Sequence, residues 1–164
     1  MKASDPAHGA VPIIREATAA DLGTIMRHRR RMFIEMGFRD ERALDAMEAT
    51  SAPFIKAGLA DGSFRGWLVE IEGTVVAGGG LVIVGYPSSP HDPKPRRAWV
   101  LNMYTEPDYR GRGLAKSIVE AMILWCRREG FSWVSLHASD AGRHLYEKIG
   151  FVPTNEMRLT LKRE

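Results

Sequence analysis

An apolar run that suits a β-strand, residues 98–105, leads into a glycine-rich turn and then into a strongly amphipathic helix. The turn reads Pro107-Asp108-Tyr109-Arg110-Gly111-Arg112-Gly113-Leu114-Ala115. Glycine tolerates positive φ and lets the backbone approach a ligand closely. The first turn of the following helix offers unpaired N–H groups at the positive end of the helix dipole. This junction therefore predicts a binding site for a phosphate group.

Apolar periodicity places the other elements around this junction. Helical spacing predicts helices over residues 19–36, 40–59, 111–129 and 140–149. Strand-like runs occupy residues 11–17, 66–72, 74–84, 98–105, 133–138, 151–152 and 157–161. The apolar stripe of the first helix contains one polar residue, Arg29, and the run Gly78-Gly79-Gly80 predicts a bulge or a close backbone approach. The order of the elements predicts an α+β fold, a mixed sheet with helices on its faces.

Size and composition indicate an ordinary globular chain. With 164 residues, 45% of them hydrophobic, we expect one domain over residues 11–164 and a flexible N-terminal tail over residues 1–10. A single cysteine, Cys126, excludes an internal disulfide and a thiolate metal site, and we expect no metal.

Charge and hydropathy limit the partners. The net charge of +3 suits an anionic cofactor but is too small and scattered to indicate nucleic acid, and the basic run 27–31 is typical of a solvated helix face. No apolar stretch reaches the roughly 20 residues that span a bilayer, and residues 1–10 lack the apolar core of a secretory signal. We expect a cytoplasmic protein that binds neither nucleic acid nor membranes.

Three glycine-rich anion motifs compete for the turn. A P-loop fails because Ala115 precedes Lys116-Ser117 and Arg110 stands where its first glycine should be. The dinucleotide fingerprint fails because Lys116 occupies its third small-residue position. The third pattern, Arg/Gln-x-x-Gly-x-Gly/Ala, is satisfied by Arg110, Gly113 and Ala115.

This third pattern resembles the acyl-CoA pyrophosphate loop of the GNAT superfamily of N-acetyltransferases. Residues 14–21 resemble the opening strand and first helix of that family, residues 102–107 its fourth strand with a proline at the exit, and residues 145–151 its Leu-Tyr-x-x-x-Gly-Phe segment. The resemblance implies a GNAT-like, mostly antiparallel sheet of roughly six to seven strands with about four flanking helices. It also implies that the fourth and fifth strands are splayed.

The resemblance implies acetyl-CoA as co-substrate, with its pyrophosphate on the turn and its acetyl-pantetheine arm along the fourth strand. The residues expected to contact it are Met103, Tyr104, Thr105, Arg110, Gly111, Arg112, Gly113, Leu114, Ala115 and Lys116. Ser139 is expected to replace an asparagine that relatives often place before the Leu-Tyr segment, and Arg143 is expected to reach a CoA phosphate.

Acetyl transfer to an amine requires a deprotonated amine, a polarised thioester carbonyl and an acid for the departing thiolate. The resemblance assigns the acid to Tyr146, because a phenol stays protonated at neutral pH. The resemblance also implies that a backbone N–H near Tyr104 polarises the carbonyl. Relatives often carry the base as a carboxylate on the fourth strand, but residues 98–105 contain none. The alternatives for the base are Glu35, Glu70, His137, a chain of water molecules, or an amine that arrives partly neutral.

The acceptor, a small-molecule amine or a peptide, is expected between residues 36–39, the proline-rich loop 85–96 and the ends of the last strands. The residues expected to line this site are Phe38, Tyr86, Trp99, Asn102 and Met157. The resemblance also allows a homodimer. Three other functions stay open: O-acetylation or use of another acyl-CoA, a CoA-binding sensor without catalysis, and a nucleic-acid-binding domain.

Overall fold

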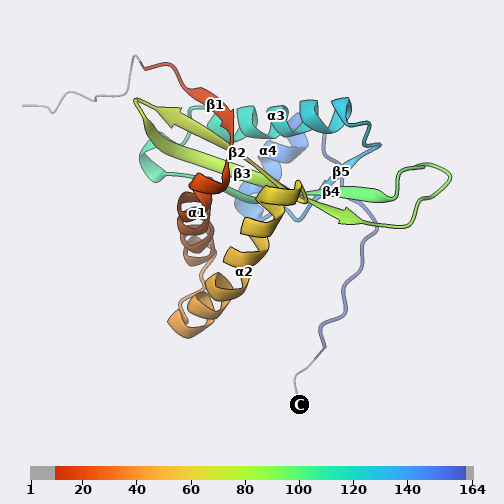
Figure 1. Cartoon of the computed structure of the whole chain (residues 1–164), viewed down its shortest axis with the longest axis horizontal. Coiled ribbons are helices and arrows are strands. Elements are labelled where there is room, and N and C mark those ends of the chain that lie inside the picture. Colours follow the sequence, from red (N-terminus) through yellow and green to blue (C-terminus); the bar gives the residue numbers. More distant parts are fainter. Residues whose placement is uncertain (1–9, 162–164) are drawn as a thin grey trace, which may run out of the picture.

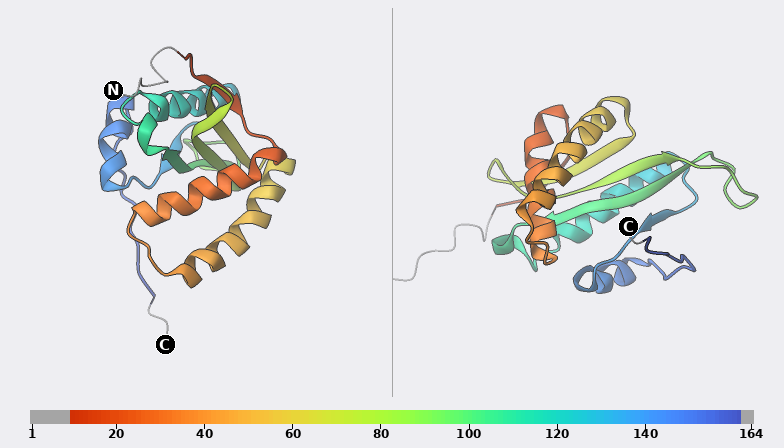
Figure 2. Two further views of the ribbon diagram at one scale, coloured as in Figure 1. Left: turned by 90° about the vertical axis from the view of Figure 1, so that its left-hand side faces the viewer. Right: turned by 90° about the horizontal axis from the view of Figure 1, so that it is seen from below.

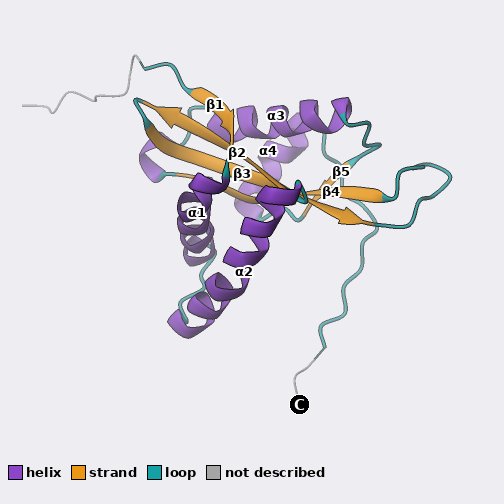
Figure 3. Cartoon of the chain, viewed as in Figure 1, coloured by secondary structure: helices purple, strands orange, loops and turns teal. Residues whose placement is uncertain are grey.

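The computed structural model describes residues 10–161, which form one sheet with helices on both faces (Figures 1 and 3). The strands are β1 (Ile13–Glu16), β2 (Phe64–Ile71), β3 (Thr74–Gly85), β4 (Arg96–Thr105) and β5 (Val134–Leu136). The helices are α1 (Leu22–Glu35), α2 (Glu41–Asp61), α3 (Leu114–Arg128) and α4 (Asp140–Ile149), with short 3-10 turns η1 (Ala19–Asp21) and η2 (Pro107–Tyr109). The strands lie in chain order, antiparallel from β1 to β4 and parallel between β4 and β5.

The expected fold class is confirmed, but the strand count over residues 10–161 is five rather than six to seven. Residues 151–161 form no strand, although Met157, Leu159 and Leu161 alternate with polar residues. These three side chains are 94%, 82% and 81% exposed. Alternation of apolar and polar residues puts the apolar side chains on one side of an extended segment, but a β-strand also needs a neighbouring strand with which to exchange backbone hydrogen bonds. Figures 1 and 2 show this segment running away from the sheet.

Two apolar clusters cover the two faces of the sheet. Trp67, Val69 and Ile71 alternate along β2 and pack in one cluster with the buried stripe of α3. Phe64 belongs to the other cluster, with residues of α1 and α2. Figure 2 shows α3 on one side of the sheet and α1 and α2 on the other. The sheet is therefore a buried central layer, and each face of β4 meets a different helix layer.

β4 contains one extra residue where it passes the glycine run of β3. Asn102 and Met103 both lie opposite Gly79, between the register pairs Gly78–Tyr104 and Gly80–Leu101. Asn102 has a φ of +56°. A Cβ at Gly79 would clash with Met103 Sδ, so any larger residue there would require that side chain to move. The predicted bulge at the glycine run is confirmed.

The N-terminal tail predicted for residues 1–10 lies outside the described residues, apart from Ala10. This residue packs against the apolar cluster formed by β2 and α3. Within residues 10–161, no helix is both long and apolar enough to cross a bilayer. In the same part of the chain, no three His, Cys, Asp or Glu side chains gather in an arrangement that would hold a metal ion.

Candidate active site

β4 and β5 separate halfway along β4. They pair only at Ala98–Val134, Trp99–Ser135 and Val100–Leu136. From Leu101 to Thr105, β4 has no strand partner on its β5 side among the described residues. The backbone groups that point to this side are therefore open to an extended ligand. The expected splay between the fourth and fifth strands is confirmed, and the bulge at Asn102 lies where it begins.

The turn after β4 leads to a helix without a side-chain cap. Gly111 and Gly113 adopt φ values of +73° and +78°, and Gly113 is the residue immediately before α3. The N–H of Ser117 donates to the Gly113 carbonyl oxygen at 3.1 Å, closing the first turn of the helix. The N–H groups of residues 114–116 precede that turn and have no intrahelical acceptor. This helix end suits an anion.

The two arginines of the turn are held by protein acceptors. Arg110 Nη2 donates to both carboxylate oxygens of Glu35 at 2.7 Å, and Arg110 Nε donates to the Thr105 carbonyl oxygen at 2.9 Å. Arg112 Nη2 donates to the Asp108 carbonyl oxygen at 3.1 Å. Arg110 therefore joins the turn to the end of α1, a contact that the sequence pattern does not predict.

A shallow pocket of about 320 Å³ lies between α1 and the end of β4. It is lined by Arg31, Ile34, Glu35, Tyr104, Glu106 and Pro107. The Tyr104 hydroxyl lies 3.4 Å from a carboxylate oxygen of Glu35 and 3.4 Å from one of Glu106. Arg31 holds Glu106 through both carboxylate oxygens, at 2.6 and 2.7 Å. Burial and these two carboxylates raise the pKa of Tyr104. The pocket thus places two carboxylates beside the end of the open strand.

His28 lies behind this pocket and is 2% exposed. Its Nε2 atom is 3.6 Å from Glu106 Oε1, and its ring centroid is 5.0 Å from that of Tyr104. Neither ring nitrogen has a hydrogen-bond partner in the part of the chain that the structure describes. Burial, assisted by the nearby charge of Arg27, lowers the pKa of His28 to about 4. The imidazole is therefore neutral at pH 7.

Tyr146 lies on α4 and is 9% exposed. Its ring packs edge-on against Phe151, with the centroids 5.7 Å apart. Burial raises the pKa of the phenol above its ordinary value of 10, so the hydroxyl carries its proton at neutral pH. This is the protonation state that a general acid requires.

Residues 25–151 match the model of the acetyltransferase (GNAT) family. The chain belongs to the GNAT family. The resemblance drawn from the sequence motifs is thereby confirmed, and the family is one of acyltransferase enzymes.

Solved structures of acetyltransferases share the fold over nearly the whole chain. A GCN5-related N-acetyltransferase from Ralstonia eutropha JMP134 is 34% identical, with 92% of this chain and 99% of that chain covered and a TM-score of 0.85. A predicted acetyltransferase from Clostridium acetobutylicum, solved with acetyl-CoA, is 24% identical, with 93% and 96% covered and a TM-score of 0.84.

A curated human protein, N-acetyltransferase 8B, is 25% identical over 114 residues, which are 68% of this chain. The match covers 48% of the human protein, so this GNAT chain spans about half of that relative.

Two predicted cofactor contacts of this GNAT protein lie on α4. Ser139 is the N-cap of the helix, and its hydroxyl accepts from the Gly142 N–H at 3.3 Å, which gives the side chain a structural role. Arg143 is exposed and lies 4.0 Å from the Glu147 carboxylate. Their roles in cofactor binding stay predictions.

Two of the predicted acceptor residues are connected through α1. The Phe38 ring packs on Phe33 with centroids 5.5 Å apart, and the Arg29 guanidinium lies 5.0 Å from the Phe33 centroid. Arg29 Nη1 donates to Asn102 Oδ1 at 2.5 Å. Phe38 and Asn102 therefore lie at two ends of one continuous set of contacts. The sequence pattern assigns no function to Arg29, although an arginine on an otherwise apolar helix stripe was the available signal.

Tyr86 lies apart from this set of contacts. Its ring is 3.3 Å from the Arg97 guanidinium, and its N–H donates to the Pro95 carbonyl oxygen at 3.0 Å. Arg97 is near the start of β4, about 25 Å along the strand from Thr105 at about 3.3 Å per residue. The structure does not bring Tyr86 to the open end of β4, because the β3–β4 loop projects from the opposite end of the sheet (Figure 1).

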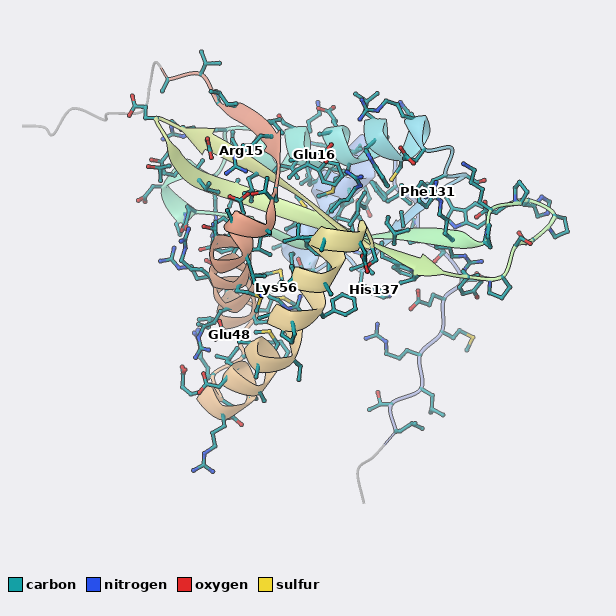
Figure 4. All side chains as sticks on the ribbon, viewed as in Figure 1. Arg15, Glu16, Glu48, Lys56, Phe131 and His137 are labelled. Carbon is teal, nitrogen blue, oxygen red and sulfur yellow. The ribbon has the colours of Figure 1, made fainter. Side chains whose placement is uncertain are left out.

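Of the three side chains considered as the base, only Glu35 lies at the pocket. Glu70 accepts a hydrogen bond from Arg15 of β1 at 2.8 Å, and His137 is exposed beside a carboxylate of the C-terminal segment, 2.9 Å away. Arg15 and His137 are labelled in Figure 4. The sequence did not point to Glu106 as a base, because this residue follows the apolar run of β4 and does not lie within it. Its position directly before the exit proline was the available signal.

Proposed function

We propose that this protein transfers the acetyl group of acetyl-CoA to a primary amine by direct attack in a ternary complex. The observation that carries the proposal is the open edge of β4, residues 101–105, which leads into the uncapped start of α3. An extended pantetheine arm can hydrogen-bond to such an edge as an added strand would. A pyrophosphate suits the helix N–H groups at its end. The Clostridium relative of the same fold, solved with acetyl-CoA, supports this ligand.

The cofactor contacts follow from this placement. Met103, Tyr104 and Thr105 lie on the open part of β4 and would run along the thioester arm. Residues 110–116 would surround the pyrophosphate. Because Arg110 is bound to Glu35, a phosphate that attracts the guanidinium would also loosen that carboxylate.

The reaction would proceed in one displacement. The amine nitrogen attacks the thioester carbonyl carbon, a C–N bond forms, and the C–S bond breaks. A backbone N–H near Tyr104 stabilises the oxyanion. The departing sulfur takes the phenolic proton of Tyr146, and the nitrogen gives its proton to Glu35 or Glu106 at the end of β4.

A thiol-release assay tests the proposal. Acetyl-CoA is offered with amines, amino acids, aminoglycosides and peptide N-termini, and release of free CoA is expected with at least one class. Tyr146→Phe should lower kcat about 100-fold and leave the Kd for CoA unchanged. Tyr86→Phe, the matched control at the far end of β4, should keep wild-type kcat.

Two results would contradict the proposal. Bound CoA without thiol release from any acceptor would identify a sensor instead of a transferase. Full turnover by Tyr146→Phe at every pH would remove the acid role from this tyrosine.

We also propose a homodimer in which the alternating apolar side chains of residues 157–161 meet a second copy of the chain. Their exposure of 81–94% supports this, since such a pattern is costly to leave in water. Light scattering should give a dimer mass for the wild type and a monomer mass for Leu159→Asp. A wild-type monomer at all concentrations would contradict it.

A further inference from the structure

Arg29 is a cation on the inward face of α1 that has no acidic partner within residues 10–161. Its guanidinium is partly buried, with Nε 3.2 Å from Met47 Sδ and Nη1 bonded to Asn102 Oδ1. The ring of Phe33 lies against it. None of these groups carries a negative charge. Burial lowers the pKa of this guanidinium, and no carboxylate in the described part of the chain raises it.

The next two arginines of α1 are neutralised, which makes Arg29 different. Arg31 donates to both carboxylate oxygens of Glu106. Arg30 is surrounded by the carboxylates of Glu41, Asp45 and Glu48. A charge that is withdrawn from water without a counter-charge is unfavourable. An anion that arrives at Arg29 would remove this cost.

Asn102 supplies a second, independent observation. The side chain is 5% exposed and its Oδ1 is occupied by Arg29, but its Nδ2 has no acceptor among the described residues. Its backbone has a φ of +56° at the bulge of β4. The side chains of Arg29 and Asn102 therefore offer several N–H donors and one acceptor atom, Asn102 Oδ1, which already accepts from Arg29. This excess of donors is suited to a ligand that only accepts hydrogen bonds.

The ligand chemistry follows from these donors. A carboxylate accepts two parallel hydrogen bonds from a guanidinium and has further lone pairs for an amide N–H. Its single negative charge balances the single positive charge of Arg29, whereas a phosphate dianion would leave an excess negative charge in a partly buried position.

The donors lie where the acceptor is expected. Asn102 is at the start of the open edge of β4, and Phe33 connects Arg29 to Phe38 after α1. Building on the proposed transferase function, we propose that Arg29 and Asn102 bind a carboxylate of the acceptor. The acceptor is then an amino acid or another amine that carries a carboxylate, held with its amine toward the thioester.

Pairs of acceptors that differ only in this group test the inference. The common L-amino acids are compared with their α-carboxamides at saturating acetyl-CoA. The best amino acid should have a kcat/KM at least tenfold above that of its amide. Arg29→Gln should raise the KM for the amino acid about 100-fold, with kcat and the KM for acetyl-CoA changed less than twofold. Arg29→Lys should recover part of the loss, because it keeps the charge without the planar fork.

Two further variants separate this role from general effects. Arg27→Gln removes the same charge from an exposed position of the same helix and should leave the KM unchanged. Asn102→Asp supplies a carboxylate to Arg29 from within the protein, at a residue type that tolerates positive φ. It should raise Tm and abolish the preference for amino acids over amides.

The outcomes distinguish the two proposals. Equal use of acids and amides, with a wild-type KM in Arg29→Gln, would overturn the carboxylate site and leave the transferase intact. Amino acids that raise Tm in the wild type but not in Arg29→Gln, with no thiol release, would support the carboxylate site and overturn the transferase. A change in CoA affinity alone in Arg29→Gln would assign the arginine to the cofactor and overturn the inference.

Discussion

Acidification should destabilise this protein through His28 before its carboxylates are protonated. The imidazole is 2% exposed, and its pKa is about 4 in the native protein against 6.5 in an unfolded chain. Between these values the unfolded chain holds a proton that the native protein does not. Stability is therefore complete above about pH 6.5 and falls as the pH drops toward 4.

The size of this loss follows from the two pKa values. At about 1.4 kcal/mol per pH unit, the gap between 6.5 and about 4 amounts to about 3 kcal/mol of unfolding free energy. This is a large share of the 5–15 kcal/mol that is typical of a domain. The pKa of Asp21 is lowered from 3.8 to about 2, chiefly by its hydrogen bond to Arg15, so the stability it contributes is lost only below about pH 4.

Urea unfolding at several pH values between 4.5 and 7.5, followed by tryptophan fluorescence, measures this effect. His28→Gln removes the titrating group and should flatten the pH dependence of the unfolding free energy. Tyr146→Phe is the control, because its phenol has a pKa above 10, and it should keep the wild-type slope. If the wild type and His28→Gln lose the same stability over this range, the burial argument for His28 is wrong.

Three more predictions concern the backbone that supports the site. Gly113→Ala places a Cβ at a φ of +78°, so it should weaken CoA binding in calorimetry and lower the free energy of unfolding by about 1 kcal/mol. The control, Gly23→Ala on the open surface of α1, should raise the free energy of unfolding by up to about 1 kcal/mol. Unchanged CoA affinity in Gly113→Ala would contradict the phosphate site. Gly79→Ala should lower the free energy of unfolding in urea by about 1–3 kcal/mol, because its Cβ would clash with Met103 Sδ; a neutral result would mean that the Met103 side chain moves aside. Asp40→Ala removes the N-cap of α2 and should lower the free energy of unfolding in urea by about 1 kcal/mol. An unchanged free energy would show that water replaces the cap.

Local patterns predicted the parts of the fold that depend on near neighbours. The α4 boundaries, 140–149, agree with the structure, and the stripe of α3 is buried as its spacing indicates. The strand expected at 157–161 was not found, because strand formation also requires a partner edge. Tyr86 was assigned to the acceptor site from loop composition, and that composition gives no direction for the loop.

The glycine turn and the helix that carries Tyr146 follow from local sequence, because each depends on φ or on a spacing of a few residues, although α3 begins at Leu114 rather than at residue 111. Tertiary packing, in contrast, selects which charges are neutralised. Arg29, Arg30 and Arg31 are adjacent and alike in sequence, yet Arg31 meets Glu106, Arg30 meets the acids of α2, and Arg29 meets an amide at a bulge. Those partners are 11 to 75 residues away, and helix packing against α2 and β4 selects them. Ion pairing depends on distance in space, and the local pattern does not contain that distance.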